Sequence, residues 1–118
     1  MVRVPGPGRF ELRLPDGAAN PYLLQAVIIA AGLNGLSSRA NPGKRSDNDM
    51  YAEADKVIDA PKLPLNLLDA IRAFDEDKSL KSSLGDEFSN AYINLKTQEW
   101  NDYASHFSTW ERQNTLDV

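Results

Sequence analysis

Residues 9–23 read Arg-Phe-Glu-Leu-Arg-Leu-Pro-Asp-Gly-Ala-Ala-Asn-Pro-Tyr-Leu, and this stretch decides the fold of the chain. Charged and apolar residues alternate over its first six positions, which is the period of a half-buried β-strand. A strand of this kind would direct Phe10, Leu12 and Leu14 into a core. The Pro-Asp-Gly that follows is typical of a turn, and Asn20 is a typical N-cap for a helix that begins at Pro21.

The opposite face of this strand would carry Arg9, Glu11 and Arg13, which are two guanidinium groups on either side of one carboxylate. Arginine binds anionic oxygens through a planar fork, and a carboxylate is a ligand for a divalent cation. These residue types suit a phosphoryl-transfer site, where catalysis depends on positioning and charge neutralisation. The spacing alone also fits a second interpretation, in which Arg-x-Glu-x-Arg is a solvated face with weak ion pairs.

The sequence that follows favours the first interpretation, because residues 9–23 and the Ala-Ala-Gly-Leu-Asn-Gly-Leu at 30–36 closely resemble one family. They are similar to the C-terminal part of the glutamine synthetase catalytic domain. In that family an Arg-x-Glu-x-Arg strand leads through an acidic turn into Ala-Asn-Pro-Tyr-Leu and a helix of small residues. The resemblance is strong over residues 3–36 and looser beyond. The ending at residues 110–118 looks most like the type III-like branch, which includes gamma-glutamylmethylamide synthetases.

The resemblance implies a role for each of four residues. Glu11 corresponds to a glutamate that ligates one of the divalent metals bridging the nucleotide phosphates. Arg13 corresponds to an arginine that contacts the glutamate substrate and the transferring phosphoryl group, and Arg9 to one that binds nucleotide phosphate. Arg3 corresponds to the arginine of an Arg-Ile-Pro segment that stabilises the transferred phosphate. The Pro-Gly-Pro-Gly link at residues 5–8 is shorter than in many relatives.

The resemblance implies that the whole protein is an ATP-dependent ligase of nitrogen assimilation. Such an enzyme joins glutamate to ammonia, or to a small amine such as methylamine, through a gamma-glutamyl phosphate. It uses ATP with Mg²⁺ or Mn²⁺ and works as a large homo-oligomer. The family needs further carboxylates and an N-terminal domain, so we expect this chain alone to be inactive. The alternative is a truncated, non-enzymatic module that self-associates or packs on a synthetase subunit.

The composition bounds the remaining possibilities. The chain has 118 residues, a net charge of −4, 42% hydrophobic residues and no cysteine. The acidic balance argues against nucleic-acid and anionic-membrane partners, and the lack of thiols is consistent with a cytoplasmic location. The apolar run over residues 22–36 is shorter than a membrane-spanning helix requires. His106 is the single histidine, and we expect it to be a surface or packing residue.

The expected fold is α+β, a mainly α-helical C-terminal fragment of the glutamine synthetase catalytic domain with a short N-terminal β-strand or hairpin. The expected segments are a strand and active-site arm at 1–19, a buried helix at 20–36, a surface loop at 37–61 and a helical C-terminal segment at 62–118. The loop contains Tyr51, near the position where some bacterial family members carry an adenylylated tyrosine. Its neighbours match that motif poorly, so an ordinary loop tyrosine is favoured.

Capping residues predict where the helices of the last segment begin and end. Gly85 is expected to close a short helix over 78–84. The expected caps at helix starts are Asn66 with Asp69, then Asp86, then a capping box of Ser108 and Glu111.

Overall fold

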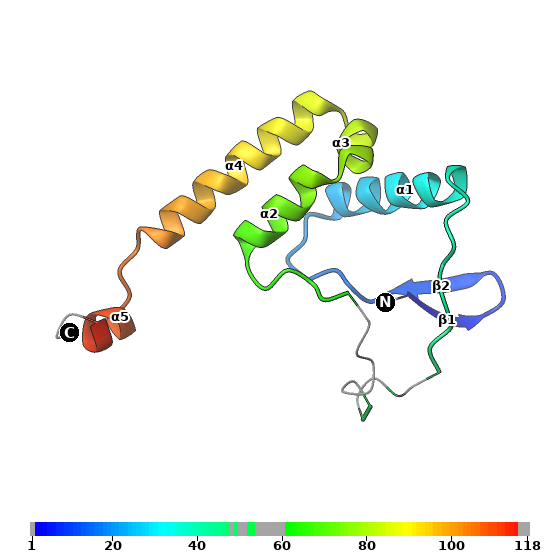
Figure 1. The fold of residues 1–118 in the computed structure, drawn as a ribbon, viewed down its shortest axis with the longest axis horizontal. Helices are drawn as coiled ribbons and strands as arrows, with labels where there is room; N and C mark the ends of the chain where they lie inside the picture. Colours follow the sequence, from blue (N-terminus) through cyan, green and yellow to red (C-terminus); the bar gives the residue numbers. More distant parts are fainter. Residues whose placement is uncertain (1, 48, 50–51, 54–60, 116–118) are drawn as a thin grey trace. The chain divides into compact units, whose positions relative to one another are not determined.

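The structure is a computed structural model, and it describes residues 2–47, 49, 52–53 and 61–115. The mainly helical α+β class predicted from the sequence is confirmed (Figure 1). The elements are β1 (Val2–Gly6), β2 (Arg9–Leu12), α1 (Pro21–Ser37), α2 (Leu67–Glu76), α3 (Lys78–Leu84), α4 (Asp86–Ala104) and α5 (Thr109–Thr115). The chain divides into two compact units, residues 1–40 and 41–118, and each is described by itself.

Strands β1 and β2 form an antiparallel hairpin joined by Pro7 and Gly8. Gly8 has a φ of +71°, a conformation that glycine adopts without steric cost, and proline before it suits the first central position of a turn. Arg3 lies opposite Glu11, and Gly6 lies opposite Arg9. Between these two pairs β1 advances three residues while β2 advances two, so β1 contains a bulge.

The side chains on the other face of β2 do not enter a core, so that part of the strand prediction is wrong for this chain. Phe10 is 62% exposed and Leu14 is 39% exposed, while Leu12 is half-buried. A two-stranded sheet has no inner face unless another element packs on it. Among the described residues of this unit, α1 packs on neither strand.

Helix α1 begins at Pro21, as the sequence predicts, and ends at Ser37, one residue beyond the expected end. The side chain of Asn20 accepts hydrogen bonds from the backbone N–H groups of Tyr22 and Leu23, at 3.0 and 3.2 Å. Pro21 occupies the first helical position, where its missing N–H costs nothing. At the other end, the hydroxyl group of Ser38 donates to the carbonyl of Asn34 at 2.7 Å.

The prediction that this helix is buried is contradicted in this chain. None of its residues is buried, and Tyr22 and Leu36 are 82% and 76% exposed. The sequence is apolar on nearly every side, which is the pattern of a helix enclosed by other elements. No described element of its own unit provides that enclosure. The composition of α1 is therefore that of a buried helix, but no described element of its unit packs against it.

The second unit has a small core where α2, α3 and α4 contact one another. Ile71 of α2 is 8% exposed and is the one buried hydrophobic residue in the described part of the chain. Phe74 meets Tyr92 edge-on with ring centroids 6.2 Å apart, and Phe88 stacks on Tyr92 at 6.0 Å. Ser89 of α4 is fully buried, and its hydroxyl group donates to the carbonyl of Lys81 on α3 at 3.3 Å. We conclude that a few aromatic and aliphatic contacts hold this unit together.

Most of the predicted caps of the second unit are confirmed. Asn66 accepts from the N–H of Asp69 at 2.9 Å. Ser108 and Glu111 form the predicted capping box, since each backbone N–H donates to the other's side chain, at 2.8 and 3.2 Å. The expectation that Asp86 caps a helix is wrong, because Asp86 is the first residue of α4 and its side chain makes no cap.

Gly85 occupies the N-cap position of α4 with a φ of +91°. Gly85 is therefore both the C-cap of α3 and the N-cap of α4, and the first turn of α4 has no side-chain cap. Asp86 and Glu87 still stabilise the first turn, because acidic side chains interact favourably with the positive end of the helix dipole.

Apart from Ser37, which is the last residue of α1, the predicted surface loop has no helix or strand among its described residues, and residues 38–47 are all exposed. Tyr51 lies outside the described residues. Over the described part of the chain, no helix combines the length and the apolar character that crossing a membrane requires.

We predict that Ile71→Ala lowers the free energy of unfolding of the second unit by about 2 kcal/mol or more, because it removes the buried side chain at the centre of a small core. Leu95→Ala is the matched control, since Leu95 is 60% exposed on α4 and its truncation should change the free energy by less than about 0.5 kcal/mol. Urea unfolding followed by circular dichroism measures both. Equal effects of the two substitutions would contradict this assignment of the core.

Candidate functional site

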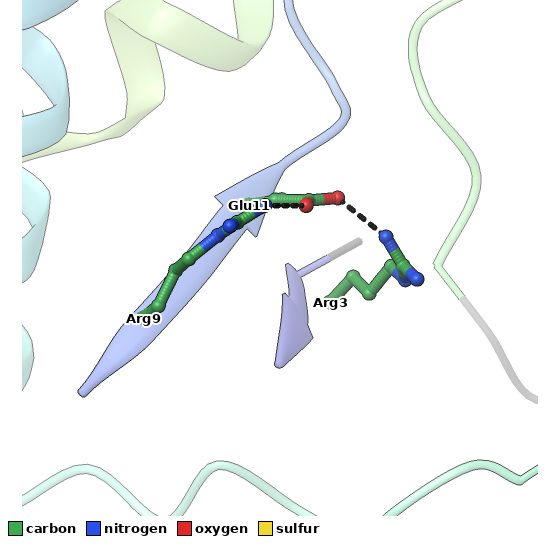
Figure 2. Close-up of polar contacts among 3 residues, drawn as sticks. All are labelled: Arg3, Arg9 and Glu11. Atoms are coloured by element: carbon green, nitrogen blue, oxygen red, sulfur yellow. Dashed lines mark hydrogen bonds and ion pairs between the residues drawn. The ribbon is translucent and has the colours of Figure 1, made fainter. Parts of the chain in front are cut away.

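The hairpin register brings two arginines and one glutamate onto one face (Figure 2). Arg3 Nη1 donates to Glu11 Oε2 at 2.9 Å from the strand opposite, and Arg9 Nη2 donates to Glu11 Oε1 at 2.8 Å along the same strand. Arg9 and Glu11 share a face because they lie two residues apart on a strand. Arg3 joins them because the bulge and the turn set it directly across from Glu11. We call these three residues the arginine–glutamate cluster.

The electrostatics of the cluster favour an ionised carboxylate and leave an excess of positive charge. The hydrogen bond from Arg3 and then that from Arg9 hold the pKa of Glu11 below its usual range, and the charges of Arg3 and Arg13 lower it further. The side chain of Glu11 is 30% exposed, whereas those of Arg3 and Arg9 are 59% and 70% exposed. Two guanidinium groups against one carboxylate leave a net charge of +1 facing solvent.

Arg13 follows β2 directly and is exposed. Its charge contributes to the low pKa of Glu11, which places its positive charge within the electrostatic range of the cluster. The sequence spacing predicted a row of Arg9, Glu11 and Arg13, and the structure pairs the first two directly. Arg3 was expected only from the family resemblance. Nothing in the local spacing of residues 9–13 indicates a partner on the preceding strand.

The described residues do not form a metal site by themselves. In that part of the chain, no group of three or more histidine, cysteine, aspartate or glutamate side chains is arranged to hold an ion. Each carboxylate oxygen of Glu11 is also hydrogen-bonded to a guanidinium group. A divalent cation usually needs several oxygen ligands, so one engaged carboxylate is not enough.

The cluster is better suited to an anion with several oxygens. A guanidinium group has five N–H donors in a fixed plane, and the contact with Glu11 engages one nitrogen of each arginine. The other donors of Arg3 and Arg9 match the spacing of phosphate oxygens. The exposure of both side chains leaves them accessible to such a ligand.

A shallow apolar hollow of about 100 Å³ lies between α2 and α4, and it was not predicted from the sequence. Its lining includes Leu67, Ile71, Phe74, Tyr92 and Lys96. The helical spacing of the first three residues was a signal for a core stripe rather than for a site. The volume is smaller than that of pockets which bind drug-sized molecules. His106, which the sequence analysis set aside, is exposed.

Comparison with known proteins decides the family. Residues 1–115 match the model of the glutamine synthetase catalytic domain, which is nearly the whole chain. The chain belongs to the glutamine synthetase family.

Individual members of the glutamine synthetase family resemble the chain along its full length. It is 70% identical over 118 residues to a glutamine synthetase from Rhizobium leguminosarum bv. phaseoli, covering 100% of this chain and 27% of that protein. It is 40% identical over 123 residues to a glutamate–methylamine ligase from Methyloversatilis universalis, covering 99% of this chain and 27% of that protein.

A solved structure described as apo GmaS without ligand has a TM-score of 0.93 and 53% sequence identity with this chain. It covers 100% of this chain, which covers 28% of that one. The chain therefore spans about a quarter of the length of these glutamine synthetase relatives. The resemblance inferred from residues 9–36 is confirmed, and so is the interpretation of the chain as part of a larger catalytic domain. The roles of the four site residues stay predictions.

We predict that Arg3→Gln raises the pKa of Glu11 and that Arg13→Gln raises it less. Arg3 contributes both a hydrogen bond and a nearby charge, whereas Arg13 contributes charge alone. Because folding lowers the pKa of Glu11, its ionised carboxylate stabilises the hairpin at every pH above the usual pKa of a glutamate. That stabilisation is lost as the pH falls through the lowered value. NMR titration of the Glu11 carboxylate carbon measures both effects.

The internal control for this titration is Glu111 in the other unit, whose pKa is lowered by hydrogen bonds from Ser108. Its pKa should stay unchanged in both variants. If the pKa of Glu11 rose more in Arg13→Gln than in Arg3→Gln, the conclusion that Arg3 lowers this pKa more than Arg13 does would be contradicted.

Proposed function

We propose that this chain is the C-terminal part of the catalytic domain of an ATP-dependent ligase that joins glutamate to ammonia or to methylamine. The reaction runs through a gamma-glutamyl phosphate, in the cytoplasm and within a homo-oligomer. The observation that carries this proposal is the arginine–glutamate cluster, which presents two guanidinium groups on one face of a hairpin in a member of this family. One relative is named a glutamine synthetase and another a glutamate–methylamine ligase, and together they support both acceptors.

The arginines perform the charge-stabilising part of this chemistry. Arg9 binds an oxygen of the nucleotide phosphates, and Arg3 stabilises the phosphoryl group as it is transferred. Arg13 contacts the substrate glutamate and the same phosphoryl group. Phosphoryl transfer gains most of its rate from positioning and from neutralising charge on the equatorial oxygens. Planar, permanently charged guanidinium groups are suited to both tasks.

Glu11 is proposed as one ligand of a divalent metal ion, Mg²⁺ or Mn²⁺, in the longer protein. Because no group of three or more histidine, cysteine, aspartate or glutamate side chains in the described residues could hold an ion, the further ligands must come from outside them. When bound, such an ion neutralises charge on phosphate oxygens. The incomplete ligand set is also the reason why we propose that the isolated chain has no ligase activity.

A hybrid enzyme tests the function with the residues of this chain. In it, the chain replaces the matching segment of the Rhizobium leguminosarum glutamine synthetase, which is 70% identical. We predict that the hybrid forms glutamine from glutamate, ammonia and ATP. Arg9→Gln should lower its kcat/KM for ATP by about 10- to 100-fold, because a hydrogen bond to a charged group contributes about 1.5–3 kcal/mol.

Arg45→Gln is the matched control, because Arg45 pairs with Asp47 at 2.7 Å in an exposed arrangement outside the hairpin. This substitution should leave kcat/KM unchanged. The isolated chain should give no ATP-dependent glutamine or methylglutamine. Turnover by the isolated chain, or an Arg9→Gln hybrid as active as its parent, would contradict the proposal.

A second candidate function is a non-enzymatic module that associates with copies of itself or with a synthetase subunit. The observation that favours it is the exposure of α1, where Ile29 is 62% exposed and Leu33 is 59% exposed. Contiguous exposed apolar surface is rare on monomers and typically marks an interaction site. This candidate and the ligase are compatible, because the same helix face would be covered in a complete catalytic domain.

We predict that the isolated chain binds a hydrophobic dye and scatters light as a species larger than a monomer. Ile29→Asp should lower both signals, since it places a charge on the exposed apolar face of α1. Gln25→Asp is the matched control, because it adds the same charge at an exposed polar position of the same helix and should lower them less. A clean monomer without dye binding would exclude the second candidate.

A further inference from the structure

Within the arginine–glutamate cluster, both arginines pair with the same carboxylate, that of Glu11. The two oxygens of Glu11 bind two different guanidinium groups, at 2.9 and 2.8 Å, so the carboxylate bridges Arg3 on β1 and Arg9 on β2 (Figure 2). Two guanidinium groups near one another repel unless a negative charge lies between them. The carboxylate therefore holds both arginines on one face and neutralises part of their charge.

An anionic ligand that engages every donor of both guanidinium groups also needs the two N–H groups that bind Glu11. Phosphate oxygens and carboxylate oxygens use the same planar N–H fork of arginine. An anion that binds both forks fully must therefore replace the oxygens of Glu11, and the carboxylate must move away from two positive charges. A glutamate side chain is ionised at neutral pH, so the Glu11 carboxylate competes there with the anion for the guanidinium groups.

We infer that Glu11 is an internal counter-ion of this site: in the ligand-free chain it holds Arg3 and Arg9, and an oligophosphate anion binds by displacing it. This inference rests on the proposed phosphate-binding role of the hairpin and adds a regulatory role for its glutamate. Displacement has a second consequence. Once released, the carboxylate oxygens are no longer engaged by guanidinium groups and become available to other ligands.

The test measures the affinity of the 118-residue chain for inorganic tripolyphosphate, without divalent metal, by NMR titration of the arginine side-chain N–H groups. If Glu11 competes with the anion, Glu11→Gln removes the competitor. We expect this variant to bind tripolyphosphate about three- to tenfold more tightly than the wild type, which lies within the range given by two exposed ion pairs. The loss of a negative charge beside the two arginines would by itself also strengthen anion binding, so further variants are needed.

Two further variants separate displacement from a simple change of net charge. Glu11→Asp keeps the charge but shortens the side chain by one methylene, so the carboxylate no longer reaches both guanidinium groups. We expect it to bind tripolyphosphate more tightly than the wild type, though less tightly than Glu11→Gln. Asp47→Asn removes one negative charge from another arginine–carboxylate pair of the same spacing and should leave the affinity within about twofold.

A measurement on the wild-type chain covers the case in which a variant loses its hairpin. Cross-strand contacts between Val2 and Leu12, which lie opposite each other, report whether the hairpin is formed. Saturating tripolyphosphate should move the carboxylate carbon resonance of Glu11 toward that of the exposed Glu87. Tripolyphosphate bound at Arg3 and Arg9 with an unchanged Glu11 resonance would overturn the inference.

Three other outcomes would also overturn it. They are equal affinities of wild type and Glu11→Gln, a gain of equal size for Asp47→Asn, and no tripolyphosphate binding by any variant. Failure of the proposed function looks different, because it is an Arg9→Gln hybrid enzyme that keeps its activity. An Arg9→Gln hybrid that loses activity, combined with equal anion affinities, would reject the counter-ion and retain the ligase.

Discussion

The cross-strand ion pair between Arg3 and Glu11 is the contact on which the candidate site depends, and it exists only in one hairpin register. The Pro7–Gly8 turn and the bulge in β1 fix that register. A slip of one residue would send the side chains of a strand to its opposite face and separate the pair. The site is therefore set by backbone geometry several residues away from the charged groups, and the charged groups in turn hold the two strands together.

The rest of the chain shows a contrast between local and tertiary stabilisation. Helix ends are closed by hydrogen bonds within a few residues, as at Asn20 and in the Ser108–Glu111 capping box. Packing between elements is sparse, and in the described residues Ile71 is the one hydrophobic side chain that is buried. Because a 17-residue apolar helix lies exposed in this chain, its stability in a complete domain must come from surfaces that other segments provide.

This contrast explains what the sequence predicted and what it did not. Helix starts were predicted correctly where a side chain caps the helix, because capping is a local interaction. The start of α4 was assigned to the wrong residue because the backbone of Gly85, rather than the side chain of Asp86, makes that boundary. The strand was predicted correctly from the alternation of charged and apolar residues. The predicted burial of Phe10 was wrong, because burial requires another element to pack on the strand, and a local sequence pattern does not show whether one does. Arg3 as the partner of Glu11 required a register that includes a bulge.

Two interpretations of Arg-x-Glu-x-Arg were opposed at the outset, a solvated ion-pair face and a phosphate site. With Glu11 as a counter-ion they become two states of the same residues. Without ligand, the carboxylate takes the place that phosphate oxygens would occupy, and the arginines stay near one another at little electrostatic cost. With ligand, the anion takes over that neutralising role. A glutamate between two arginines then keeps the forks on one face before the ligand arrives, and it lowers the affinity for the anion that must displace it.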